Sequence, residues 1–216
     1  MNKKRRADSL HKLATKNEPD ITRILKEIIN TNTKHFCTIE IRQIDENFKI
    51  KTFESLLRKI INDDNEEKKK KEEEKEKGKE KEIYDTLRYT YIVTFTDPKQ
   101  TDLSKCISHI NKLLEDKQIN LVRTKNFFCP NNTYKGINNV YTYNDYKFEL
   151  QFHTNTSIKI KEINHYLYEK ERSLNSETDA KLISGIKDAE RILSSVITEI
   201  YSDENDQCVI KTKEAQ

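Results

Sequence analysis

The chain has 216 residues, of which 36% are charged and 34% are hydrophobic. This content supports one domain with a modest core and excludes a fully disordered chain. The charges nearly cancel, to a formal net charge of +3, so charge alone does not indicate a nucleic-acid-binding protein. No run of eighteen uncharged apolar residues occurs, and we therefore expect a cytoplasmic protein with no membrane partner.

The cysteines are spaced too irregularly to suggest a metal site. They lie far apart and form no C-x-x-C pair, which argues against zinc and gives no disulfide framework. We expect all four to be reduced thiols. They are Cys37, Cys106, Cys129 and Cys208.

The first third of the chain predicts two helices and a strand. Residues 1–17 are polar and are expected to be a flexible leader. Apolar residues recur at helical spacing over 20–32, where Asp20 can cap the start. Residues 37–44 alternate between apolar and polar side chains, as in a strand, and residues 53–61 carry a second helical apolar stripe.

A run dominated by Lys and Glu, residues 63–82, interrupts these patterns. It has no apolar stripe with which to join a core, so it is predicted to be an insert, either a solvated helix or a mobile loop. Apolar patterns resume after it, and the core must close across it. We therefore predict one domain over residues 18–201, followed by a flexible tail at 202–216.

The second half of the chain predicts strands and helices in turn. Asn144 and Asp145 tolerate turn geometry and separate two strand-like runs, which predicts a hairpin. The whole order indicates an α+β fold, with a mixed β-sheet flanked by helices. The predicted elements are strands at 89–95, 119–128, 140–143 and 147–153, and helices at 103–114, 157–172 and 177–201.

A segment rich in lysine begins at Lys49 and reads K-I-K-T-F-E-S-L-L-R-K. Lys51, Ser55 and Lys59 are four residues apart, so all three approach one face of a helix at its N-terminal end. Cations and free N–H groups converge at such an end, which suits phosphate. The segment resembles the R-x-K-x-x-x-S-x-x-x-K phosphate-binding segment of the RelA/SpoT alarmone synthetases.

Three further segments, and one pair of helical residues, resemble motifs of the same family. Asp85 directly precedes a strand, as the family's metal-binding Asp does; residues 134–138, Y-K-G-I-N, look like its Y-x-S-x-H loop. Residues 149–154, E-L-Q-F-H-T, are similar to its E-x-Q-x-R-T strand, and His165 begins an H-x-x-Y match. The segments follow the family's order over roughly residues 48–172. This resemblance implies a divergent member with a nucleotidyltransferase-like synthetase fold.

The activity that the resemblance implies is a Mg²⁺-dependent pyrophosphokinase. Such an enzyme transfers pyrophosphate from ATP to the ribose 3′-hydroxyl of a purine nucleotide, here GDP or GTP. The resemblance implies that Asp85 and Glu149 are the catalytic pair and the Mg²⁺ ligands. It assigns the phosphates of ATP to Lys49, Lys51, Ser55, Lys59 and Arg88. It assigns the acceptor nucleotide to Tyr134, Asn138, Gln151, His153, Arg123 and Lys125.

The sequence departs from the family pattern on both the donor and the acceptor side. Two family arginines sandwich the donor adenine, but Lys49 and Thr90 stand in their places, with Arg88 two residues before Thr90. Lysine lacks the planar guanidinium that stacks on a base, so donor recognition must differ. The acceptor side departs as well, so the acceptor need not be GDP or GTP. The acceptor positions that depart are Gly136, Asn138 and His153.

Two other functions stay open on the sequence alone. One is a toxin-like transfer of pyrophosphate to an RNA or tRNA 3′ end, in which the lysine-rich segments contact phosphates. The other is a catalytically inactive nucleotide-binding or interaction module, in which the lost arginines mark decay. For a free-standing enzyme of this kind, we expect the two C-terminal helices to offer a face for homo-oligomerisation.

Overall fold

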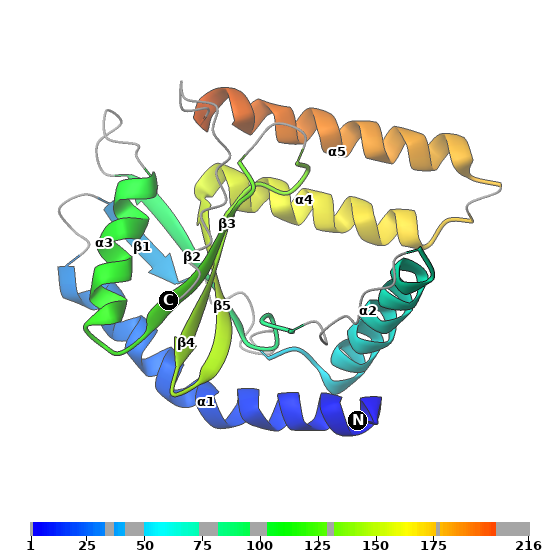
Figure 1. Cartoon of the computed structure of the whole chain (residues 1–216). Helices are drawn as coiled ribbons and strands as arrows, with labels where there is room; N and C mark the ends of the chain where they lie inside the picture. Colours follow the sequence, from blue (N-terminus) through cyan, green and yellow to red (C-terminus); the bar gives the residue numbers. More distant parts are fainter. Residues whose placement is uncertain are drawn as a thin grey trace.

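The computed structural model describes residues 2–32, 37–41, 50–73, 82–95, 103–128, 132–175 and 178–201. Helices and a single sheet make up these residues (Figure 1). The strands are β1 Cys37–Ile41, β2 Arg88–Phe95, β3 Asn120–Asn126, β4 Ile137–Tyr143 and β5 Tyr146–Thr154. The helices are α1 Lys3–Asn32, α2 Phe53–Glu73, α3 Leu103–Glu115, α4 Asn155–Arg172 and α5 Ala180–Tyr201.

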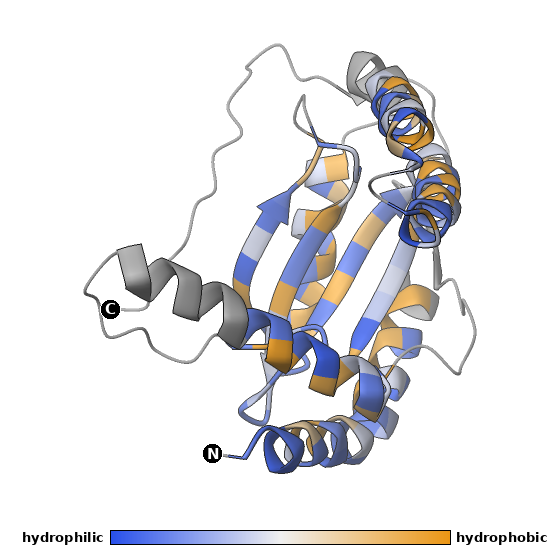
Figure 2. Cartoon of the chain, turned by 90° about the vertical axis from the view of Figure 1, so that its right-hand side faces the viewer, coloured by the Kyte–Doolittle hydropathy of each residue, from blue (hydrophilic) through white to orange (hydrophobic). Residues whose placement is uncertain are grey.

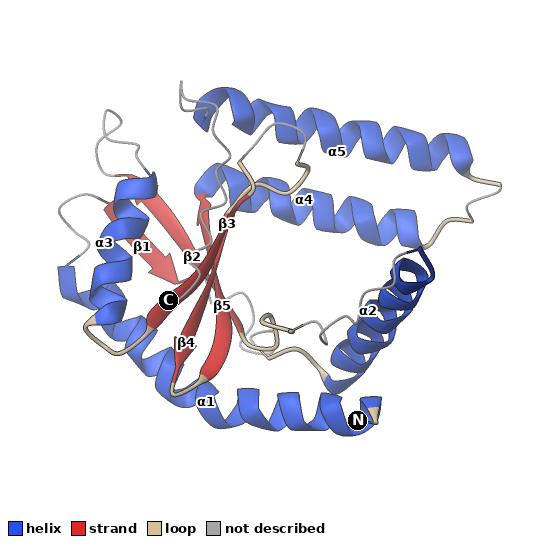
Figure 3. Ribbon diagram, viewed as in Figure 1, coloured by secondary structure: helices blue, strands red, loops and turns tan. Residues whose placement is uncertain are grey.

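The five strands form one mixed sheet in the order β1-β2-β5-β4-β3. β2 and β5 pair in parallel, and the other neighbours pair antiparallel. The predicted hairpin is confirmed: Asn144 and Asp145 both have positive φ, at 48° and 61°, and they join β4 to β5. The predicted α+β fold with helices around a mixed sheet is therefore confirmed (Figure 3).

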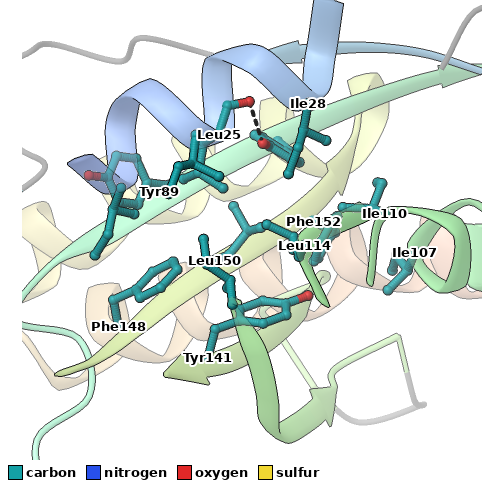
Figure 4. Close-up of a cluster of buried hydrophobic side chains, with 14 of the residues drawn as sticks. Leu25, Ile28, Tyr89, Ile107, Ile110, Leu114, Tyr141, Phe148, Leu150 and Phe152 are labelled. Carbon is teal, nitrogen blue, oxygen red and sulfur yellow. Dashed lines mark hydrogen bonds between the residues drawn. The ribbon is translucent and has the colours of Figure 1, made fainter. Parts of the chain in front are cut away.

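One face of the sheet carries the main hydrophobic core. Along β5 the side chains alternate, and Phe148, Leu150 and Phe152 are fully buried against α1 and α3. From α1 the core takes Leu25 and Ile28, which lie over these strands in Figure 4. The same alternation is visible as bands of hydrophilic and hydrophobic residues along the strands in Figure 2. The polar residues of β5 must therefore point to the opposite face.

Helix α4 packs on that opposite face and begins without a connecting loop. Thr154 ends β5 and is also the N-cap of α4: its side chain accepts a hydrogen bond from the Ser157 N–H, and the Ser157 hydroxyl accepts one from the Thr154 N–H. This capping box fixes the direction in which α4 leaves the sheet. Helix α5 lies alongside α4 (Figure 1).

The expected flexible leader is instead helical, and the expected helix start at Asp20 is wrong. α1 begins at Lys3 and continues through Pro19. Ala7 is fully buried in a second small core with Leu56 and Ile60 of α2, which gives the polar N-terminal half of α1 a surface to pack on. Such packing decides helix formation more than propensity does.

Helix α2 runs on into the Lys/Glu-rich insert and ends at Glu73. The first half of the insert is thus a helix, which was one of the two forms expected for it. Residues 74–81, like the predicted tail at 202–216, lie outside the described residues.

The expectation of four reduced thiols is wrong, because Cys106 on α3 is disulfide-bonded. Spacing along the sequence does not reveal which thiols the fold brings together. Among the described helices, none combines the length and the apolar character that a membrane crossing requires.

Candidate functional site

The lysine-rich segment is placed by a short antiparallel bridge. Ile50 pairs with Leu87, and the Lys51 N–H donates to the Thr86 carbonyl at 2.8 Å. Immediately afterwards Thr52 caps α2, because its hydroxyl oxygen accepts a hydrogen bond from the Ser55 N–H at 3.3 Å. The bridge sets Lys51 beside the residues that lead into β2, and the cap starts α2 directly after it.

Asp85 is held by two lysines from this segment. Lys51 Nζ donates to its Oδ2 at 2.5 Å, and Lys59 Nζ donates to its Oδ1 at 2.7 Å. The Asp85 side chain is only 17% exposed, whereas those of Lys51 and Lys59 are 20% and 34% exposed. The structure therefore gathers three of the sequence-predicted site residues into one cluster, with two positive charges around one carboxylate.

Charge in this cluster shifts two pKa values. Burial alone would raise the pKa of Asp85, but the hydrogen bonds and charges of Lys51 and Lys59 outweigh burial and lower it to about 2. Burial lowers the pKa of Lys51, and Asp85 offsets part of that shift. The carboxylate is therefore ionised and the ammonium groups are held close together, although like charges repel.

Ser55 and Lys49 are the other two residues of this segment that the resemblance assigns to the phosphates. Ser55 is half-buried on α2, and its Oγ accepts a hydrogen bond from Arg58 Nη2 at 3.3 Å. Lys49 lies outside the described residues.

Glu149 and Gln151 line the polar face of β5. In the parallel register, Glu149 lies opposite Arg88 of β2 and Gln151 lies opposite Thr90. Gln151 Nε2 donates to Glu149 Oε1 at 2.7 Å, which orients the carboxylate. Gln151 is 3% exposed, and its own Oε1 accepts a hydrogen bond from Lys161 Nζ of α4 at 2.7 Å.

Tyr134 sits in a network at the start of β4. Its hydroxyl donates to Asn138 Oδ1 at 2.8 Å and lies 2.9 Å from His153 Nε2. Its ring meets that of Phe127 edge-on, at 5.2 Å between centroids, and Lys161 Nζ lies 6.0 Å from its centroid. Burial raises the pKa of Tyr134, so the phenol stays neutral.

The loop that carries Tyr134 is fastened to the two C-terminal helices. The Thr133 carbonyl accepts hydrogen bonds from Asn164 Nδ2 of α4 at 2.8 Å and from Ser194 Oγ of α5 at 2.6 Å. Tyr134 is thus fixed at its hydroxyl by the sheet and at its backbone by the helices.

His153 is fully buried, which does not agree with its expected place against the acceptor's sugar and phosphates. Its Nε2 lies against the Tyr134 hydroxyl, and its Nδ1 lies 3.0 Å from Ser157 Oγ. Burial, with the charges of Lys161 and Arg88, holds the pKa of His153 well below its usual value. The neutral ring therefore supports Tyr134 from behind and presents no charge to a ligand.

Arg123 and Lys125 share the same face of the sheet, further along it. Lys125 pairs with Asn138, which pairs in turn with Gln151, so these three residues form one row across three strands. In the neighbouring row Arg123 pairs with Val140, which pairs with Glu149. Paired residues point the same way, so both cations face the side on which α4 packs.

Arg88 lies between the two groups of residues. It is exposed, three residues after Asp85 along the chain and opposite Glu149 across the sheet. Its charge also contributes to the lowered pKa values of Lys51 and His153. The lysine cluster and the Tyr134 network therefore lie on either side of Arg88 and can act as one site. By contrast, His165 and Tyr168 are exposed on α4.

A cation in this site would have few protein ligands. Within the described ranges, no three His, Cys, Asp or Glu side chains gather closely enough to hold a metal. Asp85 and Glu149 nevertheless suit Mg²⁺, which commonly takes one or two carboxylates and completes its shell with phosphate oxygens and water. Both oxygens of Asp85 already accept a lysine, so a cation must compete with Lys51 and Lys59.

Three polar residues of the site were not predicted from the sequence: Ser157, Lys161 and Asn164. All lie on α4 and face His153, Gln151 and the Tyr134 loop, respectively. Their spacing of four and three residues places them on one helix face, and this spacing is the signal that could have found them.

No family model and no curated protein sequence matches the chain. Small alarmone synthetase 2 from Bacillus subtilis is similar in structure, with a TM-score of 0.56 and 16% identity over 89% of this chain and 94% of that one. Small alarmone synthetase 1 from the same organism, bound to its product pppGpp, aligns with a TM-score of 0.46 and 16% identity over 89% and 91%. A GTP pyrophosphokinase family protein from Streptococcus pneumoniae aligns with a TM-score of 0.46 and 14% identity over 89% and 84%. The first of these carries the conclusion: the chain has the fold of a small alarmone synthetase.

Proposed function

We propose that the protein is a Mg²⁺-dependent pyrophosphokinase that transfers pyrophosphate from ATP to the ribose 3′-hydroxyl of a purine nucleotide, with GDP or GTP as the acceptor. The observation that carries this proposal is the clasp of Lys51 and Lys59 around Asp85, next to Arg88 and Glu149. An alarmone synthetase fold supports it.

The donor phosphates would bind at the start of α2. Lys51 and Lys59 carry two ammonium groups, and the N-terminal end of the α2 dipole adds partial positive charge. A polyphosphate offers several anionic oxygens to these donors, whereas Asp85 offers two. We therefore expect the phosphates to displace Asp85 from the two lysines. Arg88, Ser55 and, by the resemblance alone, Lys49 complete the donor side.

Asp85 and Glu149 would hold Mg²⁺ together with phosphate oxygens. The cation would supply neutralisation of the charge that develops on the phosphates. Binding of the phosphates by Lys51 and Lys59 frees the oxygens of Asp85, so we propose that nucleotide and metal bind cooperatively.

In the transfer itself, the acceptor 3′-oxygen forms a bond to the β-phosphorus of ATP, the bond from that phosphorus to the bridging α,β-oxygen breaks, and AMP leaves. The proton of the 3′-hydroxyl goes to a base, and we propose Glu149 for this role; its carboxylate accepts a hydrogen bond from Gln151. Because Gln151 is held in turn by Lys161, the carboxylate is oriented before the substrate arrives.

The acceptor would lie along the polar face of β5. Tyr134 would stack on its base, which is worth on the order of 1–3 kcal/mol. Asn138 and His153 hold the Tyr134 hydroxyl and so act through Tyr134. Gln151 would line the sugar, and Arg123 and Lys125 are the candidates for more distant phosphates.

The proposal is tested by incubating the protein with ATP labelled in the β- or γ-phosphate and with GDP, GTP, ADP or AMP, with and without Mg²⁺. We expect a labelled pyrophosphorylated nucleotide that requires Mg²⁺ and that falls at least about a hundredfold in Glu149→Gln. Glu115→Gln, at an exposed residue of α3, is the matched control and should keep full activity.

Three outcomes would contradict the proposal. A labelled tRNA that disappears with Asp85→Ala, with no labelled nucleotide, would indicate transfer to an RNA 3′ end. Stabilisation by nucleotide with no product from any acceptor would indicate an inactive binding module. Full activity of Glu149→Gln would remove the proposed base.

A further inference from the structure

The acceptor side of the site has a charge that the sequence motifs do not assign. His153 occupies the place where the strand motif that it resembles has Arg, yet its ring is fully buried and both of its nitrogens lie against hydroxyl groups. It cannot present a cation to an acceptor. A positive side chain reaches this wall from a different element, helix α4.

That side chain is Lys161. Its Nζ donates to Gln151 Oε1 at 2.7 Å and lies 6.0 Å from the centroid of the Tyr134 ring. It therefore sits over the two residues that would contact the acceptor's sugar and base. A cation near a ring face is attracted to it, which holds the ammonium group over the wall.

Two residues fix helix α4 on either side of Lys161. Ser157, one turn before Lys161, closes the capping box at Thr154 and contacts His153, and Asn164, about one turn after it, holds the Thr133 carbonyl. Both turns of α4 around Lys161 are thus tied to the site. Preorganisation of this kind favours binding, because less side-chain freedom is lost.

We propose that Lys161 is the acceptor-side cation: it binds an anionic oxygen of the acceptor nucleotide while it positions Gln151, and through Gln151 the carboxylate of Glu149. This proposal rests on the proposed function of the site. A lysine that only satisfied the buried amide of Gln151 would need no charge, and this difference is measurable.

The experiment compares the full chain with Lys161→Gln, Lys161→Arg and Lys161→Met by titration with GDP, GTP and guanosine, and separately with a non-hydrolysable ATP analogue. Gln at this position can still donate to Gln151 but carries no charge. Lys159→Met is the matched control, because Lys159 is exposed on the same helix. Unfolding midpoints establish that each variant is folded.

We expect Lys161→Gln and Lys161→Met to weaken binding of GDP and GTP at least about tenfold, as for loss of a charge-assisted hydrogen bond. Binding of guanosine and of the ATP analogue should change less than about twofold. Lys161→Arg should restore most of the affinity, and the salt dependence of GDP binding should be shallower in the neutral variants than in the wild type.

Failure of this proposal and failure of the proposed function give different results. Unchanged GDP affinity in Lys161→Gln, or an equal loss for the ATP analogue, overturns the role of Lys161 even where product forms. Nucleotide binding that depends on Lys161, without product, overturns the pyrophosphokinase and leaves the role of Lys161. Absence of binding of GDP and GTP to the wild-type protein overturns both.

Discussion

Gly136 and His153 are fitted to each other: a Cβ atom at residue 136 would lie 2.7 Å from His153 Cε1 and 2.9 Å from the Tyr134 hydroxyl. Both distances are shorter than van der Waals contact allows. The glycine is therefore needed for space, since its φ is not positive. The three departures from the family's acceptor motifs, at Gly136, Asn138 and His153, belong to one network around Tyr134.

Gly136→Ala should break this network. The added methyl group has to displace the buried imidazole or the phenol, and we expect a loss of about 1–3 kcal/mol in the free energy of unfolding, as for overpacked cores. Chemical denaturation measures it. Gly185→Ala is the control: no atom lies within 4 Å of a Cβ there, and α5 should gain up to about 1 kcal/mol. An equal effect of the two substitutions would contradict the described packing.

His153 should make the protein less stable as the pH falls. Its pKa in the folded state lies well below 6.5, so the unfolded chain takes up a proton first as the pH drops. The contribution of neutral His153 to the free energy of unfolding is fully present above about pH 6.5. It is lost as the pH falls below this value, by up to about 1.4 kcal/mol per pH unit. We expect unfolding curves from pH 7 to pH 5 to show this slope in the wild type and a smaller slope in His153→Asn. His165→Asn, at an exposed residue, should keep the wild-type slope.

Asp85 should govern a second, more acidic transition. Its pKa falls from 3.8 in the reference state to about 2 in the folded protein, so ionised Asp85 stabilises the fold above about pH 4 and this stabilisation is lost as the pH falls through 2. The shift corresponds to about 2 kcal/mol. The free energy of unfolding should fall between pH 5 and pH 2 in both proteins. We expect this fall to be smaller in Asp85→Asn than in the wild type, by about 2 kcal/mol. Asp116→Asn, exposed after α3, should behave as the wild type does.

The N-terminal half of α1 should matter for stability. Ala7 is fully buried against the α2 side chains Leu56 and Ile60. Ala7→Glu therefore buries a charge, and we expect it to lower the free energy of unfolding by at least about 2 kcal/mol. Leu13, on the same helix, is 45% exposed, and Leu13→Glu should change stability by less than about 0.5 kcal/mol. If Ala7→Glu left thermal and chemical unfolding unchanged, this result would contradict the packing of Ala7 and favour the flexible leader expected from the sequence.

The sequence predicted the parts of the fold that local patterns control. The β4–β5 hairpin followed from Asn144 and Asp145, and the polar face of β5 followed from the alternation of its side chains. The start of α1 did not, because Ala7 is too small to stand out as part of an apolar stripe and Asp20 offered a cap for a later start. The disulfide of Cys106 was equally hidden, since it depends on which segments the fold brings together.

The candidate site shows the same division. The placement of Lys51 and Lys59 on one side of α2 was predicted from their spacing, but their shared partner Asp85 lies 34 residues after Lys51 and 26 after Lys59. The burial of His153 could not be predicted, because it depends on the absence of a side chain at Gly136 and on Ser157 of α4. Lys161 was missed because it lies beyond the end of the recognised strand motif.

Because Thr154 is both the end of β5 and the cap of α4, the wall of the site and the helix above it are one continuous piece of backbone. An inserted or deleted residue between Gln151 and Lys161 would rotate the ammonium group by about 100° around the helix axis, away from the amide that it now meets. Related chains that keep this arrangement should therefore share the ungapped signature Q-x-H-T-x-x-S-x-x-x-K, which offers a way to find them where overall identity is too low.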